Sequence, residues 1–119
     1  MSESLEEKVE RLELYVHLLR DIALEPEQYR LWDWIIVHGL NGEQYKQIKA
    51  ILKKHVLLLG SLKDGEEPSF EEISSELMKV LSPSEYLANE RGVMQLLRNA
   101  VKMTPFESLQ YYLDKSEQV

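Results

Sequence analysis

The chain has 119 residues, of which 44% are hydrophobic and 29% charged, and its formal net charge is −7 at pH 7; this balance is typical of one globular domain, expected over residues 1–119. The acidic sum argues against a nonspecific nucleic-acid binder, and the absence of cysteine excludes disulfides, thiolate nucleophiles and cysteine-ligated zinc. Because no apolar run is long enough to span a bilayer and no signal peptide is found, we expect a cytoplasmic protein without nucleic-acid or membrane partners.

Helix-start signals recur along the chain. A Ser, Thr or Asn followed three residues later by Glu or Gln has the spacing of a capping box, in which both side chains bond to the backbone of the first turn. The pattern begins at Ser4, Asn41, Ser69, Ser82 and Thr104. Pro follows the last two, and Pro26 is expected to open a further helix in the same way.

No stretch alternates apolar and polar residues with the period of a strand, so helices alone are predicted. They cover residues 4–24, 26–38, 42–59, 69–81, 83–99 and 104–115. The fold class is therefore all-α, a compact bundle of about six helices whose first helix is long and amphipathic, with heptad character. We interpret the polar loop at 60–68 as a surface connection with the composition of a hinge. The predicted core residues are Trp34, Ile35, Ile36, Ile48, Leu52, Leu77, Leu97 and Leu109.

The first predicted helix carries an apolar seam whose members follow each other at intervals of 4, 3, 4 and 3 residues. This is the spacing of a and d positions in a coiled coil, and Leu at d with Val at a favours paired parallel strands. The first-helix seam, as we name it, consists of Leu5, Val9, Leu12, Val16 and Leu19.

A second apolar stripe on the same helix consists of Tyr15, Leu18 and Ile22. The helix therefore has two sides to cover, and two interpretations stay open: the seam packs on its own chain, or its first part pairs with another subunit. We expect a homo-oligomer with the seam as its interface, a dimer being slightly favoured.

Two polar residues lie on otherwise apolar predicted helix faces. Asp33 stands near a helix start, where the helix dipole favours a carboxylate, and this structural role is preferred to a catalytic one. His55 lies on the apolar side of the third helix, and we interpret it as a hydrogen-bonded core residue rather than a ligand or a pH sensor. Residues 43–63 contain five Lys against one acid, and residues 64–90 contain eight acids against one Lys. We expect these two blocks to attract each other.

No sequence motif for catalysis, metal binding or cofactor binding is found, so no catalytic, metal or cofactor residue is predicted. We expect a protein that is not an enzyme and acts through protein–protein contacts, by self-association and in a regulatory or adaptor role toward an unidentified partner. The alternative is a small Mg²⁺-dependent all-α nucleotide pyrophosphohydrolase. The three-residue spacing of Glu7, Glu10 and Glu13 suggests it, but the downstream acidic pair of such enzymes is not found.

Three stretches of the sequence resemble the YhaI-like family, small helical proteins of Bacillus-type bacteria. They are residues 9–19 (VERLELYVHLL), 37–43 (VHGLNGE) and 69–73 (SFEEI). The resemblance covers most of the chain and implies a compact all-α domain that self-associates in a bacterium. It implies no activity, because none is established for the family. Ala100 stands where the family has a Gly near the end of the fifth helix.

Overall fold

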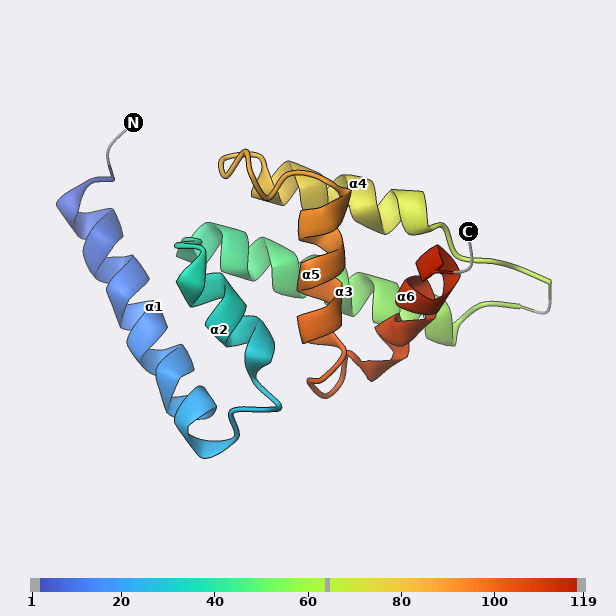
Figure 1. Cartoon of the computed structure of the whole chain (residues 1–119), viewed down its shortest axis with the longest axis horizontal. Coiled ribbons are helices and arrows are strands. Elements are labelled where there is room, and N and C mark those ends of the chain that lie inside the picture. The colour runs from blue at the N-terminus through green and yellow to red at the C-terminus, as the bar shows by residue number, and fades with distance from the viewer. Residues whose placement is uncertain (1–2, 64, 118–119) are drawn as a thin grey trace.

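The structure is a computed structural model that describes residues 3–63 and 65–117. Every regular element in these ranges is helical (Figure 1), so the predicted all-α class is confirmed. In chain order the elements are α1 (Leu5–Leu24), α2 (Arg30–Val37), α3 (Gly42–Gly60), α4 (Phe70–Leu81), α5 (Glu90–Ala100), the short 3-10 helix η1 (Glu107–Leu109) and α6 (Gln110–Glu117).

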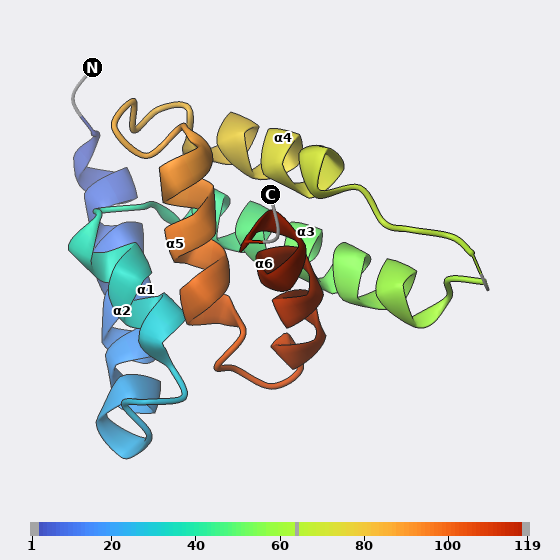
Figure 2. The ribbon, with the colours of Figure 1, turned by 45° about the vertical axis from the view of Figure 1, so that its right-hand side comes forward.

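The helices form two groups along the long axis of a molecule that measures 50 × 33 × 23 Å. At one end α1 packs on α2, and α2 in turn packs on α5. The long helix α3 runs from this end toward the other, and α4 packs alongside it (Figures 1 and 2). Among the described residues α1 packs against α2 and α3, and it forms one end of the body.

Two of the predicted capping boxes are formed in full. At the start of α1, Ser4 Oγ accepts from the Glu7 backbone N–H at 3.1 Å, and Glu7 Oε1 accepts from the Ser4 N–H at 3.3 Å. The equivalent distances for Asn41 and Gln44 at the start of α3 are 2.8 and 3.0 Å. The local sequence signal therefore placed the starts of the two longest helices correctly.

Three other predicted helix starts are wrong. Residues 26–29 form turns, and α2 begins at Arg30. Residues 82–89 turn and bend before α5 begins at Glu90, so the Ser82 box does not form. The Thr104 hydroxyl donates to the Glu107 carboxylate at 3.0 Å instead of capping a backbone N–H. We attribute the late start of α5 to the burial of Leu87, which the turn carries into the core.

Seven of the eight predicted core residues are buried: Trp34, Ile35, Ile48, Leu52, Leu77, Leu97 and Leu109. Ile36 is only partly buried, packed against the edge of the core. Residue 64, within the loop that we interpreted as a hinge, lies outside the described residues. None of the helices formed by the described residues has the length and apolar character that a membrane crossing requires.

Candidate functional site

The helix α1 is attached to the body through one side. Tyr15 and Leu18 are buried, and the Tyr15 hydroxyl donates a hydrogen bond to the Leu40 carbonyl, in the turn between α2 and α3. Leu14 and Ile22 pack beside them and are partly buried. The second apolar stripe of the sequence is therefore the side of α1 that faces α2 and α3.

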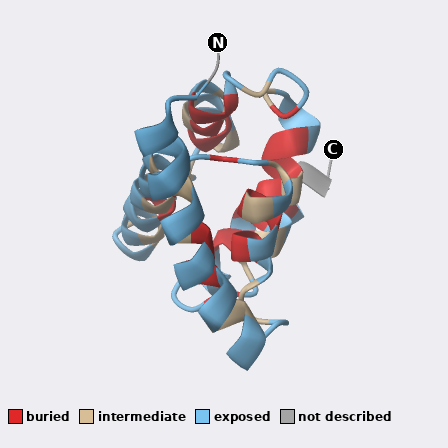
Figure 3. Cartoon of the chain, turned by 90° about the vertical axis from the view of Figure 1, so that its left-hand side faces the viewer, coloured by how far each residue is buried: buried red, intermediate tan, exposed pale blue. Residues whose placement is uncertain are grey.

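The first-helix seam points away from this contact. At 100° per residue, the seam and the buried stripe lie about a third of a turn apart. The exposed fractions are 77% for Leu5, 44% for Val9, 46% for Leu12, 61% for Val16 and 49% for Leu19. The structure thus brings all five predicted interface residues onto one exposed strip. Figure 3 faces this end of the molecule, where exposed residues dominate α1.

Charged side chains line the outer edge of the seam, and one charged side chain stands at the start of its inner edge. In heptad terms Lys8 occupies a g position on the edge nearer the body, while Glu6, Glu13 and Arg20 occupy e positions on the outer edge. All four residues are exposed. An apolar strip between charged edges has the layout of a coiled-coil surface rather than of a core-facing helix side.

An ion pair fixes the boundary between the seam and the body. Arg11 donates two hydrogen bonds to Glu3, at 2.8 and 3.0 Å, and its guanidinium lies 5.3 Å from the centre of the Tyr15 ring. These hydrogen bonds hold the pKa of Glu3 below its usual value, so the pair is ionised at neutral pH. Arg11 therefore covers the Tyr15 edge between the seam and the body.

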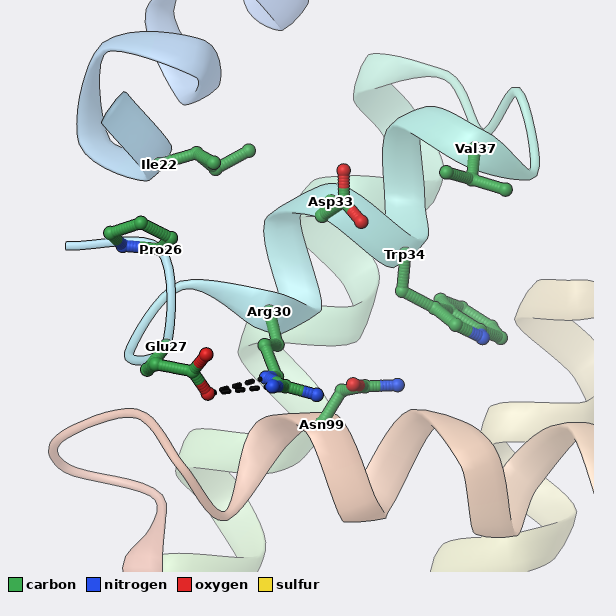
Figure 4. A pocket seen from close by; sticks show the side chains of 8 residues that line it. All are labelled: Ile22, Pro26, Glu27, Arg30, Asp33, Trp34, Val37 and Asn99. Carbon is green, nitrogen blue, oxygen red and sulfur yellow. Dashed lines mark hydrogen bonds and ion pairs between the residues drawn. The ribbon is translucent and has the colours of Figure 1, made fainter. Parts of the chain in front are cut away.

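A groove of about 450 Å³ adjoins the seam near the C-terminal end of α1 (Figure 4). Its walls come from α1, the connection between α1 and α2, α2 and α5, and they include Ile22, Pro26, Asp33, Trp34, Val37 and Asn99. On one rim Arg30 donates two hydrogen bonds to Glu27, at 2.6 and 3.0 Å. Ile22 follows Leu19 of the seam by three residues, so the two surfaces are neighbours on α1. Sequence periodicity does not reveal this groove, because Asn99 on α5 lies far along the chain from the other lining residues.

His55 is a hydrogen-bonded core residue, as predicted. Its ring is 1% exposed, with Nε2 3.3 Å from Glu76 Oε1 and Nδ1 3.2 Å from the Tyr112 hydroxyl. Because a carboxylate only accepts, His55 donates from Nε2 to Glu76, and Nδ1 is the ring nitrogen that bonds with the Tyr112 hydroxyl. Lys54 Nζ pairs with the other Glu76 oxygen at 2.5 Å. This ion pair between α3 and α4 joins the basic and acidic blocks of the sequence, as expected.

Of the three acids that suggested the pyrophosphohydrolase alternative, Glu7 is engaged in the cap of α1, and Glu10 and Glu13 are exposed on the same helix. Asp33, for which a structural role is preferred, is exposed in the first turn of α2 at the groove. Within residues 3–63 and 65–117, no three His, Asp or Glu side chains lie close enough together to hold a metal ion. Two acids of α1, Glu6 and Glu13, lie along the outer edge of the first-helix seam.

The chain is 24% identical over 83 residues to "Uncharacterized protein YqxJ" of Bacillus subtilis (strain 168), a match that spans 70% of this chain and 67% of that protein. No family model matches the chain, and no solved structure matches it. The similarity supports a grouping with small proteins of Bacillus-type bacteria. It does not confirm the YhaI-like family.

Proposed function

We propose that the protein acts through protein–protein contacts and that two copies associate through the first-helix seam. One observation carries the proposal: five Leu and Val side chains at coiled-coil spacing are exposed on a helix whose other stripe is packed. Scattered exposed apolar residues are normal on protein surfaces, whereas a continuous apolar strip marks a contact site.

The first-helix seam offers less apolar area than a standard stable interface buries. Its exposed fractions correspond to an apolar surface on the order of 400 Å² per copy. Pairing would bury about 800 Å² along the seam, below the roughly 1,200–2,000 Å² of a standard stable interface. We therefore expect association at micromolar rather than nanomolar concentration.

A second copy is the occupant that matches the seam best. It presents the same spacing and length, so that knobs from one helix meet holes in the other along the whole strip. Twofold pairs of identical surfaces are also the commonest form of protein oligomer. The proposal assigns the protein a regulatory or adaptor role in the cytoplasm, with no catalytic step and no cofactor.

Charge placed on the seam tests the proposal. Leu12→Lys introduces an ammonium that pairing would have to desolvate against apolar neighbours, so the variant should be monomeric. His17→Lys adds a cation at an exposed position of α1 outside the seam and should keep the wild-type mass. Light scattering after size exclusion gives the masses, and far-UV circular dichroism checks the folding of both variants. If both variants keep an oligomeric wild-type mass, the interface is elsewhere.

Thermal unfolding with nucleoside triphosphates and Mg²⁺ separates the proposal from the pyrophosphohydrolase alternative. A ligand present at 100 times its Kd would stabilise the native state by about 2.7 kcal/mol and raise the Tm. We expect no such rise in the Tm with any nucleoside triphosphate, with or without Mg²⁺. A reproducible shift that requires both the nucleotide and Mg²⁺ would contradict the non-enzymatic assignment.

A further inference from the structure

The charges along α1 indicate the direction in which two copies pair, an inference that rests on the proposed function. We propose that the two α1 helices lie antiparallel, with Glu6 of each copy facing Arg20 of the partner subunit. Three features of α1 support this direction: the order of its apolar residues, the partners of its edge charges and the charge of its two halves.

The seam fits itself in antiparallel order when Leu12 of one copy faces Val16 of the partner subunit. Val9 then faces Leu19 of the partner subunit, and Leu5 faces Ala23 of the partner subunit. Each layer combines a larger with a smaller side chain, as interdigitating layers do. A parallel pair would instead set Ala23 against Ala23 and leave its last layer thin. The a and d residues led us to expect parallel strands, but Leu at d with Val at a selects two strands over a larger number and does not by itself fix their direction.

Antiparallel order joins two charged side chains that have no partner among the residues that the structure describes. Glu6 and Arg20 are exposed on the outer edge, and neither side chain has an ion pair or hydrogen bond among the described residues. In an antiparallel pair the e positions of the two helices face each other, so Glu6 meets Arg20 at both ends. A parallel pair sets e against g, and Arg20 would then face Tyr15, which is buried against its own chain.

In a parallel pair, Lys8 would face Glu13 of the partner subunit and could form an ion pair with it. Lys8 already acts on Glu3 of its own chain, where it adds to the effect of Arg11 in lowering the pKa of that carboxyl. Antiparallel order does bring the two Glu13 side chains near the twofold axis. Solvent screens this one exposed contact, and two Glu6–Arg20 attractions outweigh it.

The two halves of α1 carry different charge. Residues 3–13 contain five acids against two basic residues, a net charge of −3, whereas residues 14–24 contain one acid and one base. Parallel pairing would place the two acidic halves side by side and align the two helix dipoles. Antiparallel pairing places each acidic half beside a neutral half and opposes the dipoles.

Spin labels on this cysteine-free chain measure the direction. Antiparallel pairing separates the two Leu5→Cys labels by about 18 residues, on the order of 27 Å at 1.5 Å per residue. Parallel pairing places them across one interhelical gap, within about 15 Å. We expect pulsed electron paramagnetic resonance to give the long distance. Leu24→Cys, outside the seam and 81% exposed, is a second label for which a long distance is also expected.

The outcomes separate the two proposals. A short distance at both labels would overturn antiparallel pairing while self-association stands. A labelled sample that scatters light as a monomer, together with a monomeric wild type, would overturn the proposed function itself. Charge exchange gives an independent check, since Glu6→Arg should weaken association about threefold to tenfold and Glu6→Arg with Arg20→Glu should restore it. Failure of the double variant to recover would contradict the pairing of these two residues.

Discussion

The side chain of His55 joins three helices, because its ring lies between Glu76 on α4 and Tyr112 on α6. Partial burial works to raise the pKa of Glu76, but hydrogen bonds from Lys54 and His55 outweigh it and hold that pKa below its usual 4.5. Burial, with the nearby Glu72 carboxylate, raises the pKa of Tyr112 above 10.0. The network is therefore most stable with Glu76 ionised and Tyr112 protonated.

The lowered pKa of Glu76 predicts how stability depends on pH. A carboxyl whose folded pKa is lowered stabilises the fold above its unfolded pKa, and this contribution is lost as the pH falls through the folded pKa. We expect the free energy of unfolding, from urea titrations, to fall between about pH 5 and pH 3. Glu76→Gln should make that fall shallower, whereas Glu71→Gln, exposed on the same helix, should not. Equal slopes for the wild type and Glu76→Gln would refute the role of this carboxylate.

At the scale of one element, the start of α5 depends on a close backbone contact. A Cβ atom at Gly92 would lie 2.0 Å from the carbonyl oxygen of Leu87 and 2.8 Å from its carbonyl carbon. The same turn is closed by Asn89, whose Oδ1 accepts from the Gly92 N–H at 2.9 Å. The chain therefore needs glycine here for space, because backbone atoms cannot move aside as a flexible side chain would.

Gly92→Ala tests this contact. Alanine favours a helix interior by about 1 kcal/mol over glycine, but the clash with the Leu87 backbone should reverse the sign. We expect a net destabilisation of about 2 kcal/mol in urea unfolding. Gly42→Ala, where nothing lies within 4 Å of the added Cβ, should change stability little. Unchanged or increased stability of Gly92→Ala would show that the turn at 82–89 adapts to the added methyl group.

The success of sequence signals at each helix start follows from the energies involved. A helix cap stabilises the first turn by about 1 kcal/mol. The predicted caps at Ser4 and Asn41 form, and α1 and α3 begin where the sequence predicts. Burying a Leu side chain contributes about 1.5–3 kcal/mol. Burial of Leu87 therefore prevailed over the predicted cap at Ser82.

The candidate site was predictable in part. Heptad spacing identified the five seam residues, and the same pattern revealed the second stripe on another side of the helix. Both stripes are apolar, so spacing alone could not decide which one faces inward. The decision depends on α2 and on the Leu40 carbonyl that receives the Tyr15 hydroxyl. The groove beside Ile22 depends on three segments meeting in space, which periodicity does not encode.

At the scale of the whole molecule, the position of α1 determines which surfaces of each copy remain exposed after pairing. The helix lies at one end of the long axis (Figure 1), and its seam faces away from α2 and α3. Pairing through the seam joins two copies at these ends and leaves the C-terminal end of α3 and the N-terminal end of α4 away from the interface. The distal ends of both copies are then available for a further partner, as an adaptor role requires.

The molar mass of the wild-type protein in solution tests the central claim most directly. Light scattering should be measured over a dilution series from about 100 µM to about 1 µM, which spans the association expected for an interface of this size. We predict a mass that approaches twice the monomer value of 14.0 kDa at the highest concentration and falls toward the monomer value on dilution. A mass of 14.0 kDa at every concentration would contradict self-association through the first-helix seam.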